Sequence, residues 1–164
     1  MKRAISHPLP VLFILLVVTL GMPRSAEALL EWCEVDAIGV DFGSYDPLNA
    51  SDTESTGNVA VTCKVSLAGL IVTYQIELST GGSGTYFPRE MTSGTSKLDY
   101  QLYTGAGRIT VWGDGTGASD TQNFSALVQI GTHTENFPVY GSMPSGQMVS
   151  AGSYSDTITV TVIY

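Results

Sequence analysis

Few side chains of this 164-residue chain have the type and spacing that catalysis needs. Histidine is the usual base of a hydrolytic triad, and His133 is the one histidine that follows residue 28. It lies in the segment Gly131–Thr134, whose small and polar residues we interpret as a turn between two strands. No G-x-S-x-G, glycine-rich phosphate loop or HExxH motif occurs. We therefore predict a protein that is not an enzyme, with no catalytic residues and no cofactor.

One acidic loop, residues 112–120, contains oxygen ligands of the kind that calcium prefers. Asp114 and Asp120 are its carboxylates, and they are weak metal candidates because the D-x-D-x-D-G pattern of a calcium loop is missing. The other interpretation is a tight glycine turn in which Asp114 bonds to its own backbone. The small set of two carboxylates favours the turn, so we expect no metal site.

The N-terminal segment has the three parts of an export signal. Lys2-Arg3 is positively charged, Val11–Leu20 is apolar, and Ala26-Glu27-Ala28 places small residues at the two positions that a signal peptidase reads. An apolar run of about ten residues is too short to cross a bilayer core of roughly 30 Å as a helix, which disfavours an uncleaved membrane anchor. We predict a signal peptide at 1–28 and one folded domain at 29–164.

The charge balance excludes two classes of partner. The sequence has 7 basic and 15 acidic residues, and without 1–28 it keeps 4 basic and 14 acidic ones, a formal net charge of −10. Four basic side chains cannot form the positive surface that nucleic acids or anionic membranes require. We predict no nucleic-acid partner and, because no later apolar segment is long enough, no membrane span after cleavage. Arg89 is expected to pair with a carboxylate or to lie on the surface.

Cys33 and Cys63 are the two cysteines of the sequence, and an even number in an exported chain indicates a disulfide. Two free buried thiols are the alternative. A metal pair is disfavoured because no further cysteine or histidine completes a ligand set, and the spacing does not fit a C-x-x-C redox motif. Closing a loop of this length stabilises a fold by roughly 3–4 kcal/mol in the chain-entropy model. We predict a structural disulfide that ties the start of the domain to a later strand.

Apolar and polar residues alternate with period 2 along 33–164, and no 3.6-residue stripe of helical length occurs. Turn signals rich in Gly, Pro, Asp and Ser separate the alternating runs. Seven or eight short strands predict an all-β, immunoglobulin-like antiparallel β-sandwich, with a small β-barrel as the alternative. The alternating apolar sets are Val59, Val61 and Cys63; Val72, Tyr74, Ile76 and Leu78; Leu98, Tyr100 and Leu102; Ile109 and Val111; Phe124, Ala126, Val128 and Ile130; Phe137 and Val139; and Ile158, Val160, Val162 and Tyr164.

Six segments, taken together and in order, resemble the spore coat protein U (SCPU) domain family, which includes pilin subunits of archaic, Csu-type chaperone–usher pili. Each segment is weakly specific alone, but their order and spacing extend the resemblance over nearly all of 33–164. The segments are Val40–Asp46 (VDFGSYD), Gly57–Cys63 (GNVAVTC), Phe87–Met91 (FPREM), Leu98–Tyr103 (LDYQLY), Val111–Gly115 (VWGDG) and Gly152–Val162 (GSYSDTITVTV).

The resemblance implies an incomplete sandwich that lacks its final strand. In the family, a periplasmic PapD-like chaperone lends a strand to the open groove, and a neighbouring subunit's strand replaces it at the outer-membrane usher. The last alternating strand of this sequence, with Ile158, Val160, Val162 and Tyr164 on one face, would then contact the partner strand. The alternative is that this strand is internal to a complete sandwich.

The segment before the domain differs from the family pattern. Family subunits of this type carry a donor segment of ten or more alternating residues, whereas Leu29–Trp32 alone precede Cys33 here. Four residues extend about 13 Å, which is too short to fill a neighbour's groove. Met22–Ala28 does not alternate. We therefore expect a subunit that accepts a strand and does not donate one, either at the end of a pilus or in a coat.

The resemblance and the side-chain inventory together lead to one functional hypothesis. We predict an exported, non-enzymatic structural subunit of a surface pilus or of a spore or cell coat, assembled with neighbouring subunits by donor-strand complementation. It would pass through the periplasm to the cell surface or be secreted. The alternative is a secreted carbohydrate- or calcium-binding β-sandwich module that uses Tyr103, Trp112 and the turn at 113–120.

Overall fold

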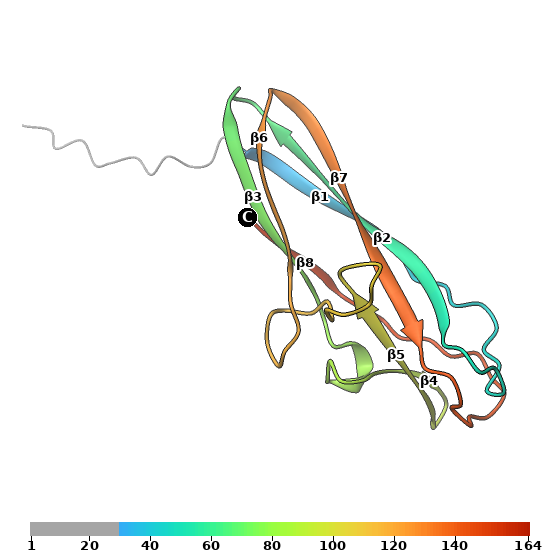
Figure 1. Ribbon diagram of the computed structural model, residues 1–164. Helices are drawn as coiled ribbons and strands as arrows, with labels where there is room; N and C mark the ends of the chain where they lie inside the picture. Colours follow the sequence, from blue (N-terminus) through green and yellow to red (C-terminus); the bar gives the residue numbers. More distant parts are fainter. Residues whose placement is uncertain (1–29) are drawn as a thin grey trace, which may run out of the picture.

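Eight strands and one short 3-10 turn form within residues 30–164, the part of the chain that the computed structural model describes (Figure 1). The predicted signal peptide, 1–28, and Leu29 lie outside the described residues, so that assignment stays a prediction. The elements are β1 (Leu30–Ile38), β2 (Thr53–Val65), β3 (Leu70–Leu78), η1 (Gly81–Ser83), β4 (Arg89–Ser93), β5 (Ser96–Tyr103), β6 (Gln122–Val128), β7 (Gly131–Met143) and β8 (Val160–Ile163).

The strands form two antiparallel sheets, in the orders β1-β2-β7-β5-β4 and β6-β3-β8. In an immunoglobulin-like sandwich, strands A-B-E-D form one sheet and C-F-G the other. The order β1-β2-β7-β5 matches A-B-E-D, while β3 and β8 match C and F. The predicted immunoglobulin-like β-sandwich is therefore confirmed, and no strand of the described residues occupies position G.

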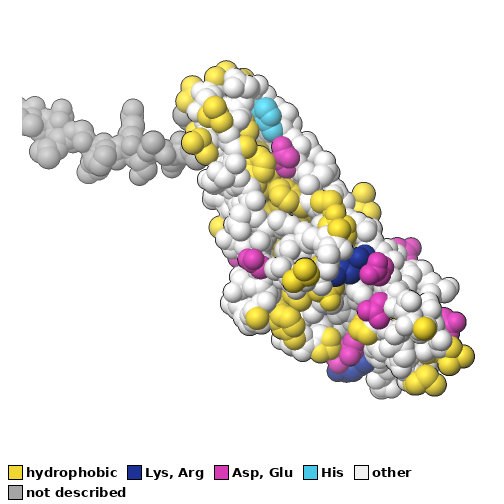
Figure 2. Space-filling view, in the orientation of Figure 1, with side chains coloured by type: hydrophobic (Ala, Val, Ile, Leu, Met, Phe, Trp, Pro, Cys, Tyr) yellow, Lys and Arg dark blue, Asp and Glu magenta, His cyan; other side chains and the backbone are white. Residues whose placement is uncertain are grey.

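The core lies between the sheets because the alternating residues of the long strands point inward. Every second residue of β2 from Val59 to Val65 and of β3 from Val72 to Leu78 is at most 5% exposed. Acidic side chains are spread over the outer surface, as the face in Figure 2 shows. Core side chains from the other elements include Leu98, Tyr100, Leu102, Trp112, Val128, Val139 and Met143.

Two local predictions are wrong. Ile109–Trp112 forms no regular strand: Val111 makes only an isolated bridge with Tyr103, and Ile109 is 88% exposed. The segment Gly131–Thr134, predicted as a turn, begins β7 and pairs with β2, with His133 opposite Cys63. In both cases, whether the segment forms a strand depends on the segment with which it pairs. Local composition does not reveal that partner.

Candidate functional site: an open groove beside β8

The outer edge of β8 is free of a paired strand within residues 30–164, as are those of β1, β4 and β6, but it lies where an immunoglobulin-like sandwich has strand G. β8 pairs with β3 from Leu78↔Val160 to Gln75↔Ile163, and no strand between residues 30 and 164 pairs with its other edge (Figure 1). Upstream, the chain crosses between the sheets, because Ser155 bridges Thr92 of β4. A strand edge of this kind presents unpaired N–H and C=O groups to any further strand.

Residues 154–163 show a two-residue alternation of burial. The even-numbered residues are half-buried and point toward the core, whereas the intervening residues are exposed. Ile158, Val160 and Val162, which we predicted on one apolar face, belong to this inward row. Tyr164 departs from that prediction, because its side chain is 68% exposed. The inward row consists of Tyr154, Asp156, Ile158, Val160 and Val162.

A groove separates this inward row from the chain at the end of β1. Its walls are residues 37–42 and 154–160, and it encloses about 290 Å³. A second hollow, of about 760 Å³, continues it between residues 40–47 and 149–154. We call the two together the β1–β8 groove. They are continuous because both are lined by the same four residues, Val40, Phe42, Met91 and Tyr154.

The floor of the β1–β8 groove is apolar and consists of the core itself. It comes from both sheets and includes Val59, Leu78, Met91, Leu102 and Val139. Of these side chains, Met91 is half-buried and the other four are buried, so the groove reaches down to the core at the place where position G is empty.

Gly141 allows one wall of the groove to cross the five-stranded sheet. A Cβ atom at this β7 position would lie 2.6 Å from Cζ of Phe42 and 2.7 Å from Cγ1 of Val40, which is closer than real side chains pack. Glycine therefore lets both side chains reach inward. The Phe42 ring then meets the Tyr100 ring edge-on, with 6.2 Å between centroids.

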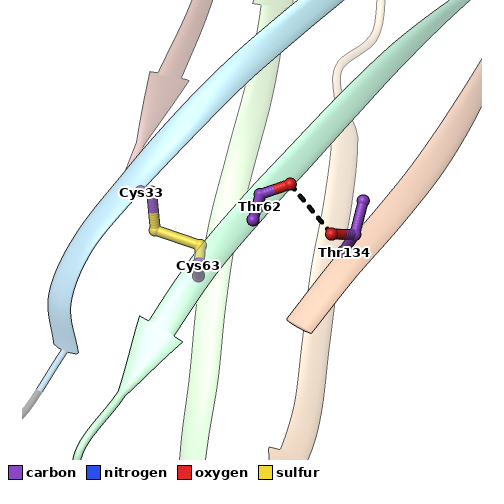
Figure 3. The surroundings of a disulfide bond; sticks show 4 residues. All are labelled: Cys33, Thr62, Cys63 and Thr134. Carbon is purple, nitrogen blue, oxygen red and sulfur yellow. Dashed lines mark hydrogen bonds between the residues drawn. A yellow bond between two sulfur atoms is a disulfide. The ribbon is translucent and has the colours of Figure 1, made fainter. Parts of the chain in front are cut away.

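The disulfide holds the other part of this wall. Cys33 of β1 and Cys63 of β2 are directly opposite each other in the strand register and are covalently joined, as predicted (Figure 3). β2 is fixed in turn to β7, where the hydroxyls of Thr62 and Thr134 lie 2.9 Å apart. Because β1 is an edge strand that pairs with β2 alone, the disulfide anchors the strand whose end lines the groove.

Arg89 is fully buried, and its hydrogen-bonding partners are carbonyl oxygens. Nε and Nη2 donate to the Ser79 carbonyl at 3.1 and 2.9 Å, Nη2 also donates to the Trp112 carbonyl at 2.7 Å, and Nη1 donates to Oε1 of Gln101 at 2.9 Å. The guanidinium also lies over the Tyr86 ring. Burial lowers the pKa of Arg89. The expectation of a carboxylate partner or a surface position is wrong, because the backbone of distant segments converges here.

Asp156 brings a carboxylate into the inward row, a feature that the sequence analysis missed. Its Oδ2 accepts a hydrogen bond from the Tyr100 hydroxyl at 2.6 Å, and Oδ1 accepts from the backbone N–H groups of Gly82 and Thr157, both at 2.8 Å. Burial, and then Asp156 itself, raises the pKa of Tyr100, so the phenol stays neutral and donates. The missed signal was the alternation itself, which continues upstream from Ile158 to Asp156.

The loop considered for calcium is a self-bonded turn. Oδ1 of Asp114 accepts from the N–H and the hydroxyl of Thr116 at 2.9 and 2.6 Å, and these bonds lower the pKa of Asp114. Oδ1 of Asp120 accepts from the Thr121 N–H at 2.8 Å. No group of three or more His, Cys, Asp or Glu side chains is placed to hold a metal within residues 30–164.

The aromatic residues proposed for carbohydrate binding do not form an exposed platform. Trp112 is fully buried, and its indole N–H donates to the Ile76 carbonyl at 3.0 Å. Tyr103 is half-buried.

Nε2 of His133 lies 2.6 Å from the Gln129 carbonyl oxygen, so the imidazole bonds to nearby backbone. The described part of the chain contains no helix long and apolar enough to cross a membrane.

Fold and groove together define a class of protein: immunoglobulin-like sandwiches with a free strand edge beside an apolar groove. Sequence comparison then identifies the family to which the chain belongs. The chain belongs to the Spore Coat Protein U domain family, whose sequence model matches residues 20–161. It is also similar to Protein U of Myxococcus xanthus, with 29% identity over 133 residues that cover 76% of this chain and 71% of the relative.

A solved structure with the same fold comes from Acinetobacter baumannii. It is the CsuC–CsuE chaperone–tip adhesion subunit pre-assembly complex of archaic chaperone–usher Csu pili, and the similarity has a TM-score of 0.55 at 23% identity. The match covers 80% of this chain and 39% of the matched chain, so the present chain spans well under half of that length. At this identity the likeness shows the shared fold.

Proposed function

We propose that this protein is an exported structural subunit of a surface pilus or coat, and that its β1–β8 groove accepts a strand from a partner protein. The free outer edge of β8 beside the apolar groove floor carries the proposal. A strand added there would pair its backbone with β8 and place alternate side chains in the apolar groove. The same strand would occupy position G and complete the sandwich.

The partners follow from the family and from the chemistry of strand addition. We infer that a periplasmic PapD-like chaperone fills the groove first and that a neighbouring subunit replaces it at an outer-membrane usher. The A. baumannii complex, which pairs a chaperone with a pilus subunit, supports a chaperone partner. This route requires export, a signal peptide at 1–28 and a folded domain at 29–164. The proposed role is structural and uses no catalytic group.

The strand pairing favours acceptance over donation. The short segment before Cys33 belongs to β1 from Leu30 onward, where Leu30 pairs with Val65 and Trp32 with Lys64 of β2 in the same domain. These residues are therefore already committed to their own sheet. A strand-accepting subunit needs only the groove, which is why we propose this role.

Co-expression with the PapD-like chaperone of the same organism tests the proposal. We expect a one-to-one complex that unfolds at a higher temperature than the chain alone. Ile158→Asp places a charge on the inward row and should abolish the complex, because a buried charge without a partner is costly. The matched control, Thr159→Asp, changes the neighbouring exposed residue and should retain it. Equal behaviour of the two variants, or a chain whose unfolding the chaperone leaves unchanged, would contradict strand acceptance.

A further inference from the structure

The β1–β8 groove is not uniformly apolar. Asp156 is the one charged residue that lines its first part, of about 290 Å³, while Asp41 lines the second hollow. It occupies the inward row between Tyr154 and Ile158, at a position where strict alternation would place an apolar residue. An incoming strand paired with β8 and its upstream extension would therefore pass directly beside a carboxylate.

The fold holds this carboxylate in a defined place. Tyr100, Gly82 and Thr157 donate three hydrogen bonds to it, whereas a carboxylate offers about four acceptor positions. A Cβ atom on Gly81 would collide with the carboxylate, and Gly81 has a φ of +69°, so this position suits glycine for two reasons. Because Asp156 lines the groove, its remaining acceptor capacity is accessible from there.

A strand that occupies the groove changes the solvation free energy of the Asp156 carboxylate. A strand lying over Asp156 removes water from the carboxylate, and a buried acceptor left without a donor costs free energy. Side chains that neighbour each other across paired strands have Cβ atoms about 4.5–5.5 Å apart, which allows direct contact. An apolar neighbour would leave the fourth acceptor position unpaired, whereas a hydroxyl or ammonium would fill it.

We propose that Asp156 is a specificity-determining residue of the groove. It selects an incoming strand that carries a hydrogen-bond donor side chain, such as threonine or lysine, beside Asp156, and apolar side chains beside Ile158 and Val160. This inference rests on the proposed function, because it describes which strand the groove accepts. The charge of the fixed carboxylate strengthens the bond, since hydrogen bonds to ionised groups are stronger than neutral ones.

A self-complemented chain provides the test. A turn and an alternating Val/Thr strand are appended after Tyr164, so that the added strand folds back along the free edge of β8. Three versions differ only at the inward position beside Asp156, which carries valine, threonine or lysine; valine and threonine are nearly isosteric. We expect all three to melt above the unextended chain, and the threonine and lysine versions to melt roughly 3 to 5 °C above the valine version.

Two matched controls show whether Asp156 causes the difference in melting temperature. Threonine moved to the inward position beside Val160 should bring no gain over valine, because only apolar groups line the groove there. Asp156→Asn, which removes the charge and keeps the shape, should reduce the advantage of lysine to less than half. Should no extension raise the melting temperature, the proposed function itself fails. If the extensions stabilise the chain but valine beside Asp156 equals threonine and lysine, or Asp156→Asn leaves the lysine advantage unchanged, strand acceptance stands and the specificity inference is overturned.

Discussion

Replacing Arg89 with methionine tests the cluster of carbonyl groups that surrounds its guanidinium. Methionine keeps most of the length and apolar bulk of the side chain but removes every donor. The Ser79 and Trp112 carbonyls then lose their bonds from the guanidinium, whereas Oε1 of Gln101 still accepts the Leu102 N–H at 3.1 Å. The change therefore deprives two backbone acceptors of a donor, and of these the Trp112 carbonyl is buried and the Ser79 carbonyl partly buried.

The size of the effect follows from these two acceptors. A buried carbonyl that loses its donor costs about 1–3 kcal/mol, so the pair costs about 2–6 kcal/mol. Removing the cation also removes its own desolvation cost, which offsets part of this loss. We expect a net destabilisation of about 3 kcal/mol, a large share of the 5–15 kcal/mol typical of a folded domain. The stability of Arg89→Lys should lie between those of the wild type and Arg89→Met, because one ammonium cannot reach all three acceptors.

Urea unfolding of the protein, analysed by linear extrapolation, measures the difference in free energy. Lys97→Met is the matched control, since Lys97 is exposed and its ion pair with Glu90 contributes at most about 1 kcal/mol. Added salt should leave the Arg89 effect largely unchanged, because Arg89 is buried and its hydrogen-bonding partners are neutral. A loss of free energy for Arg89→Met no larger than that for Lys97→Met would refute the carbonyl-cluster account.

Two further predictions concern the disulfide and the acidic loop. Replacing Cys33 and Cys63 together with alanine should lower the free energy of unfolding by about 3–4 kcal/mol, and an unchanged urea midpoint would contradict this. Because Thr116 lowers the pKa of Asp114, this carboxylate stabilises the turn above its unfolded pKa of 3.8, and the contribution disappears as the pH falls through the lower folded pKa. Asp114→Asn should therefore be destabilising at neutral pH and should weaken the acid dependence of stability, as thermal unfolding from pH 2 to 7 would reveal. If calcium raised the melting temperature of the wild type but not that of Asp114→Asn, the result would instead support a metal site.

The strands that sequence alone predicted share one property. In Val59–Val65 of β2, Val72–Leu78 of β3 and Leu98–Leu102 of β5, every second residue is apolar and buried. The pattern therefore indicates which way each side chain points without knowledge of the partner strand. The local pattern gave the wrong prediction for Ile109–Trp112 and for the first part of β7. In these segments, pairing with a neighbouring segment decides whether a strand forms. Thr132 and His133 are polar, yet they form a strand because Lys64 and Cys63 of β2 lie opposite.

The amino-acid sequence by itself determined the all-β class, the alternating faces, the disulfide partners and the family. These depend on residue types and local spacing, which a chain carries before it folds. Only the tertiary structure decided that Arg89 binds carbonyls from distant segments, that the outer edge of β8 is free, and that Asp156 lies beside Tyr100 in the groove. These features depend on which segments meet in space, and antiparallel sheets bring together residues that are far apart in the chain.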